Sequence, residues 1–287
     1  MIQFEDYLRN EKKLAGNSIS AYIKDIKELK SELLNHGVND LAEATSADIV
    51  AYILQLKQSG KSASTVNRKL ASIRAYYKYL TGEGIIQVNP AVELKTPRIK
   101  RQEVEYLEIA EVDKLLTMPL DSTSGIRDSA IMELFYATGI RATELISADV
   151  EDINLRMGFI TCDGEFGKAR IIPIGRIAKA ALEKYIFDER EAIIARNAPH
   201  KPAVAHEKAL FLNYNGGRIT RQSLWKMLKT YGEKAGIEKK ISPQILRNSF
   251  AVHMLHNGAD LKSLQELMGH EDITSTQIYM SATKNRI

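Results

Sequence analysis

The sequence predicts a mainly α-helical protein of two domains, with a small β-hairpin in the second domain. Apolar residues recur at i, i+3/i+4 and i+7 in successive windows, which is the pattern of amphipathic helices. Residues 93–106 contain Pro97 and have no helical stripe, so they separate two such regions. Two short apolar runs flank the glycine-containing residues 163–168, as strands flank a hairpin loop.

The composition is that of a globular protein with a sizeable core. The chain has 287 residues, of which 44% are hydrophobic and 26% are charged. No apolar run approaches the ~20 residues of a membrane helix, and the chain opens into an amphipathic helix rather than a secretion signal. The single cysteine, Cys162, indicates a reducing compartment. We therefore expect a cytoplasmic protein with no membrane partner.

Residues 1–88 form the first predicted domain, a bundle of helices at residues 2–13, 17–37, 46–60 and 62–80. The net charge of +4 is compatible with nucleic-acid binding but does not establish it. Candidate phosphate ligands gather at the start of the last helix, where backbone N–H groups also favour anions. They are Lys61, Thr65, Arg68 and Lys69. The alternative is that they are ordinary surface residues of a helical bundle.

Residues 89–106 are expected to be an extended linker, which would serve either a two-domain clamp or any hinge between globular domains. The second domain, residues 107–287, is predicted to contain helices at 109–116 and 127–137, strands at 159–162 and 170–174, and a helix at 177–192. A short strand at 210–212, a helix at 220–232 and a helix from Pro243 follow. Trp225 is expected in the core rather than on a surface that stacks on bases.

Residues with the chemistry of phosphoryl transfer are spread through this second domain. They are Arg141, Arg247, His270 and Tyr279. A guanidinium grips a phosphate through two parallel hydrogen bonds, and a tyrosine hydroxyl can be a nucleophile that forms a covalent intermediate. Such a site needs no metal and no cofactor. Taken alone, Arg141 is better explained as a surface arginine paired with Glu144 or Asp149, and His270 can be explained as a helix cap.

Together, four separated motifs resemble the tyrosine recombinases of the phage integrase family, and among them the Xer type, over nearly the whole chain. The motifs are Ala137-Thr138-Gly139-Ile140-Arg141-Ala142-Thr143-Glu144-Leu145, Gln244-Ile245-Leu246-Arg247-Asn248, Leu267-Met268-Gly269-His270 and Thr274-Ser275-Thr276-Gln277-Ile278-Tyr279. The resemblance implies that Tyr279 is the nucleophile, that Arg141 and Arg247 bind the scissile phosphate, and that His270 is a further donor. It also implies a C-shaped clamp on double-stranded DNA and a tetramer on two paired sites, with a paralogous recombinase as a candidate partner.

Departures from the family pattern weaken the predicted acid–base set. Gln244 replaces a histidine, and its amide can hydrogen-bond a DNA phosphate but cannot take a proton. Asn248 replaces the second histidine of the same motif. Glu165 stands where the family hairpin has a catalytic lysine, so Lys168 and Arg170 are left as the hairpin's candidate DNA ligands. The tail after Tyr279 is also short for the family's exchange of a C-terminal helix between protomers.

Three functions are compatible with these residues. A working site-specific recombinase with weakened catalysis is favoured, because both arginines, His270 and Tyr279 are present. A catalytically impaired DNA-binding partner is the alternative that Gln244, Asn248 and Glu165 motivate. A type IB topoisomerase shares the tyrosine chemistry, but the two-domain size and the Xer-like N-terminal bundle argue against it.

Overall fold

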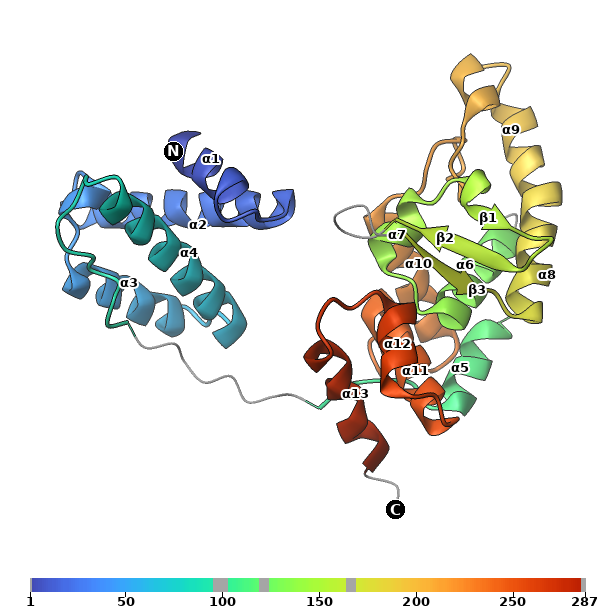
Figure 1. The fold of residues 1–287 in the computed structure, drawn as a ribbon. Helices are drawn as coiled ribbons and strands as arrows, with labels where there is room; N and C mark the ends of the chain where they lie inside the picture. Colours follow the sequence, from blue (N-terminus) through green and yellow to red (C-terminus); the bar gives the residue numbers. More distant parts are fainter. Residues whose placement is uncertain (1, 95–102, 119–123, 164–168, 285–287) are drawn as a thin grey trace. The chain divides into compact units, whose positions relative to one another are not determined.

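The computed structural model describes residues 2–94, 103–118, 124–163 and 169–284. The chain divides into two compact units, residues 1–101 and 102–287. Both units are built mainly from helices, and the second also holds a three-stranded antiparallel sheet (Figure 1). The predicted fold class, mainly α with a small sheet in the second domain, is confirmed. Within the described ranges, no helix is long and apolar enough to cross a membrane.

The first unit is a helical bundle whose core is made by the apolar stripes of its helices. They are α1 (Ile2–Asn10), α2 (Gly16–Asn35), α3 (Ser46–Gln58) and α4 (Ala63–Gly82), with a 3₁₀ turn at Leu41–Glu43. Thr45 and Ser62 cap α3 and α4, because their side-chain oxygens accept backbone N–H groups of the first turn. On α4, Val66, Leu70 and Ile73 are buried, as their helical spacing predicts.

The second unit begins with helices and continues into the sheet. Helices α5 (Ile109–Leu116), α6 (Gly125–Thr138) and α7 (Ala142–Ser147) precede strands β1 (Ile153–Asn154), β2 (Phe159–Cys162) and β3 (Arg170–Pro173). Strand β2 lies in the middle and pairs with β3 in antiparallel register, with Ile160 opposite Ile172. Both strands of the predicted hairpin are therefore present. The loop between them, which contains Glu165 and Lys168, lies outside the described residues.

Helices make up most of the rest of this unit. Helix α8 (Arg176–Lys184) continues through a π-helical stretch, Tyr185–Arg190, into α9 (Glu191–Asn197). A 3₁₀ turn (Pro202–His206) and helices α10 (Arg221–Lys234), α11 (Pro243–His256), α12 (Leu261–Met268) and α13 (Thr274–Lys284) follow. The predicted strand at 210–212 is wrong. Ala209 and Leu212 form single bridges to two different segments, at Asp149 and Arg218, so no ladder develops there.

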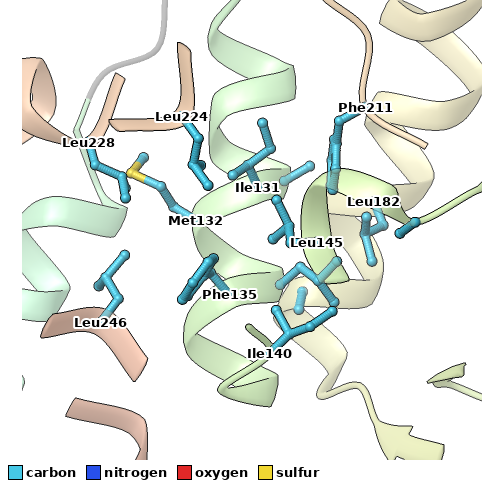
Figure 2. Close-up of a cluster of buried hydrophobic side chains, with 14 of the residues drawn as sticks. Ile131, Met132, Phe135, Ile140, Leu145, Leu182, Phe211, Leu224, Leu228 and Leu246 are labelled. Carbon is cyan, nitrogen blue, oxygen red and sulfur yellow. The ribbon is translucent and has the colours of Figure 1, made fainter. Parts of the chain in front are cut away.

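The core of the second unit surrounds α6 (Figure 2). Its labelled members come from α6, α7, α8, α10, α11 and the segments between them: Ile131, Met132, Phe135, Ile140, Leu145, Leu182, Phe211, Leu224, Leu228 and Leu246. Ile140 and Leu246 immediately precede Arg141 and Arg247 in the sequence. Full burial of one such side chain stabilises the fold by about 1.5–3 kcal/mol. The core therefore fixes the backbone from which both arginines project.

Candidate active site

Arg247 lies in the middle of α11, in the interior of the second unit. The helix starts there because Ser242 caps it, accepting the N–H of Ile245, and Pro243 occupies the first turn, where its missing N–H costs nothing. The side chain is only 5% exposed. Its guanidinium donates to the carbonyl oxygens of Gly139 and Met268. Burial and the nearby Arg141 lower the pKa of Arg247 to about 10, so the side chain stays cationic at neutral pH.

Arg141 is the residue that precedes the first turn of α7. Gly139 ends α6 in the left-handed conformation with φ of 56°, which lets the chain turn directly into α7. The Arg141 side chain donates to the carboxylate of Glu144 and to the carbonyl of Gly269. The predicted alternative, a pair with Glu144, is therefore present. The same guanidinium also lines the cavity described below.

Glu144 is the centre of an ion network, whereas the sequence predicted only a pair of Arg141 with Glu144 or Asp149. Its carboxylate accepts from the backbone and side chain of Arg141 and from two nitrogens of Arg170, the latter at 2.7 Å each. Burial raises the pKa of Glu144, but the hydrogen bonds from Arg170 and Arg141 outweigh it, and the pKa lies below the usual value. Arg170 also donates to the carbonyl of Leu267. The network ties β3 and α12 to α7.

Arg170 was predicted as a DNA ligand, and in this structure its donors are engaged within the protein. Its side chain is 13% exposed and its donors are occupied by Glu144 and Leu267. A guanidinium held by a bidentate carboxylate gains little from leaving it for a solvated phosphate. In this structure Arg170 therefore supports Arg141 rather than facing a ligand.

His270 follows α12, which ends at Gly269 in the left-handed conformation. Its Nε2 lies 3.1 Å from a nitrogen of Arg247, and its Nδ1 lies 2.8 Å from Oγ1 of Thr276. A guanidinium can only donate, so Nε2 is the acceptor and Nδ1 carries the proton that is donated to Thr276. Burial, Arg247 and Arg141 lower the pKa of His270 to about 4. The imidazole is thus neutral at neutral pH.

A cavity of about 320 Å³ brings three of the predicted catalytic side chains together. Arg141, Arg247 and His270 line it, and Gln244 does so from the first turn of α11. The remaining lining comes from Phe135, Ala142, Thr143, Arg221, Trp225 and Pro243. Two guanidinium groups and an imidazole around one hollow make a site for an anion of phosphate size. No group of three or more His, Cys, Asp or Glu side chains among the described residues is arranged to hold a metal ion.

Trp225 lines this cavity from α10, which corrects its assignment to the core. The side chain is 45% exposed, whereas Leu224 and Leu228 on the neighbouring face of the helix are buried. An aromatic ring at the rim of an anion site can stack on a base or a sugar. The tryptophan and Arg221, one turn earlier, are lining residues that sequence reasoning missed.

Tyr279 lies beside the cavity on α13, but it is not part of the cavity lining. Helix α13 packs against α11 (Figure 1). The ring of Tyr279 is parallel to that of His270, with the centroids 6.3 Å apart. The side chain is 1% exposed, and its hydroxyl donates to Oδ1 of Asn248 at 3.2 Å. Burial raises the pKa of Tyr279, and the nearby Arg247 offsets this only in part.

The residues predicted to bind DNA around the start of α4 divide into two groups. Lys61 is exposed and Thr65 is partly exposed, while Arg68 is exposed but pairs with Asp25 of α2. Lys69 is 3% exposed and pairs with both Asp25 and Glu28. Burial lowers the pKa of Lys69, but the hydrogen bonds to these carboxylates outweigh this effect, and the pKa lies above its usual value. Lys69 is thus a buried, ion-paired cation in this structure, and its contact with a phosphate stays a prediction.

Family models match both units. The model described as "Phage integrase family" matches residues 105–286, and "Phage integrase, N-terminal SAM-like domain" matches residues 1–84. The chain belongs to the phage integrase family. The tyrosine recombinase XerD of Oceanobacillus iheyensis is 41% identical to it over 285 residues, which cover 99% of this chain and 94% of the relative. The tyrosine recombinase XerC of Roseiflexus castenholzii is 38% identical over 278 residues, 96% of this chain and 86% of the relative.

Solved structures share the fold of this tyrosine recombinase. XerH bound to palindromic difH substrate, in a post-cleavage complex, superposes with a TM-score of 0.75 at 20% identity, over 99% of this chain and 82% of that one. A lambda integrase dimer bound to a COC′ core site gives a TM-score of 0.72 at 18% identity, over 97% and 93% of the two chains. The chain is accordingly an enzyme of site-specific recombination, of the Xer type.

Proposed function

We propose that this recombinase cuts and rejoins double-stranded DNA through a covalent intermediate on Tyr279. The tyrosine oxygen forms a bond to phosphorus while the bond to the 5′ oxygen breaks, which leaves a 3′-phosphotyrosyl link and a free 5′ hydroxyl. The observation that carries the proposal is one cavity lined by Arg141, Arg247 and His270, with the ring of Tyr279 stacked beside His270. The tyrosine loses its proton as the bond forms, and the leaving 5′ oxygen gains one.

The arginines are proposed to hold the non-bridging oxygens of the scissile phosphate. Preorganised cations of this kind usually provide the largest catalytic contribution, because they stabilise charge that develops in the transition state. A phosphate in the cavity favours the protonated form of His270, since an opposite charge raises the pKa of an imidazole. His270 then donates to the phosphate from Nε2 while Thr276 keeps the Nδ1 proton in place.

Catalysis is proposed to be slower than in a recombinase with the full acid–base set. Gln244 and the neighbouring Asn248 are amides, which cannot take the tyrosine proton. Loss of one general acid or base typically costs ~10²–10⁴-fold in rate. Lys168 and Glu165 fall outside the described residues, so a role of Lys168 in protonating the 5′ oxygen or binding a phosphate stays a prediction.

The first unit is proposed to contact the same DNA through Lys61, Thr65 and Arg68, with Arg68 exchanging Asp25 for a phosphate. Strand exchange joins two sites, each of which binds two protomers, so the working assembly is proposed to be a tetramer, either of this chain alone or with a paralogous recombinase.

Covalent trapping on a nicked suicide duplex tests the proposal. The duplex carries a candidate recombination site of the host, and the nick lets the cleaved strand diffuse away, so that an adduct accumulates. We expect an adduct with the wild-type chain and none with Tyr279→Phe, while a gel shift shows that both bind the duplex. An adduct that persists with Tyr279→Phe would refute the assignment of the nucleophile.

A catalytically impaired DNA-binding partner is the second candidate function. The observation in its favour is that Tyr279 is 1% exposed and bonded to an amide rather than to a base. Binding without an adduct in the same experiment, unchanged when Gln244→His and Glu165→Lys are introduced, would establish this second function instead.

A further inference from the structure

The side chain of Tyr279 does not line the phosphate cavity. Its hydroxyl lies 3.2 Å from Oδ1 of Asn248, and the tyrosine contributes nothing to a cavity wall that includes both arginines and His270. The whole side chain is 1% exposed, packed with Phe250, Val252, Leu264 and Met268. A nucleophile must reach within about 3–3.5 Å of its target in a productive geometry. The tyrosine therefore has to leave its present position before it can attack a phosphate in the cavity.

The carboxamide of Asn248 is held in one orientation by its neighbours. Its Nδ2 donates to the backbone carbonyl of Glu105 at 2.9 Å, and a carbonyl can only accept. Oδ1 therefore points the other way, where it accepts from Nε2 of Gln244 at 2.8 Å and from the Tyr279 hydroxyl. An amide oxygen has two lone pairs, so both are used. The hydroxyl is held by an acceptor that does not remove its proton.

We propose that Asn248 is a positioning residue that stores the Tyr279 hydroxyl outside the phosphate cavity, and that this hydrogen bond breaks before strand cleavage. The inference rests on the proposed role of Tyr279 as nucleophile. Gln244 connects the two sites, because it lines the cavity and donates to the same oxygen that holds the tyrosine. Residues 104–106, at the start of the second unit, also help to hold the tyrosine. The carbonyl of Glu105 orients Asn248, and the side chains of Val104 and Tyr106 pack against the hydrophobic cluster that contains Tyr279.

The size of the effect follows from one hydrogen bond between uncharged groups. Such a bond biases an equilibrium by up to about tenfold. The hydrogen bond to Asn248 therefore favours the position of Tyr279 outside the cavity, but substrate binding can overcome this preference. It lowers the rate of cleavage without abolishing it. Its removal should expose the tyrosine several-fold more often.

The test uses Asn248→Leu, which keeps the size of the side chain but removes both polar atoms. Ser249→Ala is the matched control. The Ser249 hydroxyl accepts the N–H of Leu107, so it ties the start of the second unit to the same helix without touching Tyr279. Exposure is measured as nitration of Tyr279 by tetranitromethane, quantified by peptide mass spectrometry. Nitration of Tyr185, which is fully buried, corrects for global unfolding.

We expect Asn248→Leu to raise the ratio of Tyr279 to Tyr185 nitration by about five- to tenfold, and Ser249→Ala to leave it within about twofold of wild type. A ratio in Asn248→Leu equal to wild type would overturn the proposal. On the suicide duplex, adduct formation should be faster in Asn248→Leu than in wild type, and slower formation would also overturn it. If nitration rises but no variant, wild type included, forms an adduct, then storage stands and the proposed nucleophilic role of Tyr279 fails.

Discussion

Replacement of Glu144 by glutamine tests the ion network that supports Arg141. The carboxylate is 11% exposed and is shared by Arg141 and Arg170, whose own side chain is 13% exposed. Removal of one partner from a buried ion pair costs about 3–5 kcal/mol, because the remaining charge is left without compensation. Glutamine keeps one acceptor oxygen, so we expect Glu144→Gln to lower the free energy of unfolding of the second unit by about 2–4 kcal/mol.

The assay is urea unfolding followed by tryptophan fluorescence. Trp225 is the single tryptophan of the chain and lies on α10, so its emission reports the second unit alone. Thermal unfolding gives a second measure, and each kcal/mol corresponds to about 2–4 °C for a unit of this size. Glu233→Gln is the control, because Glu233 forms an exposed pair with Lys229. Loss of such an exposed pair changes stability by less than about 1 kcal/mol.

The pH dependence has a definite sign. The folded-state pKa of Glu144 lies below its usual value, so the ionised carboxylate stabilises the fold. This stabilisation is fully present above the pKa of the unfolded chain and is lost as the pH falls through the folded pKa. The difference between wild type and Glu144→Gln should therefore be largest at neutral pH and should shrink in acid. The double variant with Arg170→Met removes the stranded cation and should recover part of the loss. Equal stability of Glu144→Gln and Glu233→Gln at neutral pH would refute the reasoning.

Three further substitutions probe the surroundings of the cavity. Gly139→Ala should cost about 2–4 kcal/mol of unfolding free energy in the same fluorescence assay, because φ is 56° and a new Cβ would collide with the ring of Phe250. Thr276→Val removes the hydroxyl that fixes the tautomer of His270, so adduct formation should fall by about tenfold while the gel shift is unchanged. Trp225→Ala should alter unfolding, measured by circular dichroism, by less than about 1 kcal/mol, because the ring is half exposed, yet weaken DNA binding in a gel shift by about 5–100-fold.

Local sequence patterns correctly predicted the helices and strands that depend mainly on neighbouring residues. The helix expected at 109–116 is α5, and the hairpin strands lie at the two short apolar runs that flank residues 163–168. The wrong predictions concern segments whose structure depends on residues far away in the sequence. Residues 210–212 have the composition of a strand, but bridges to two separate segments replace a ladder. The π-helical stretch Tyr185–Arg190 within the predicted helix at 177–192 has no signature in apolar spacing.

The positions of the candidate site residues were only partly predictable from the sequence. Arg141, Arg247 and His270 do line one cavity, as their shared chemistry suggested. The burial of Lys69 is indicated by its position in the sequence. This residue lies three residues after Val66, on the buried stripe of α4, and only the pairing with Asp25 and Glu28 makes that position tolerable for a cation. No local rule predicts that pairing, because the carboxylates belong to another helix.

The two amides that replace histidines are one structural unit rather than two separate losses. Gln244 and Asn248 are four residues apart on α11, the spacing at which helical side chains meet, and they are hydrogen-bonded. The spacing alone could have predicted that bond. It could not have predicted that the same amide oxygen holds the hydroxyl of Tyr279, which belongs to another helix. A restoring Gln244→His therefore also removes a donor from Asn248 and alters the storage of the nucleophile. Its effect on cleavage has to be compared with that of Gln244→Met, which removes the same donor but supplies no proton acceptor.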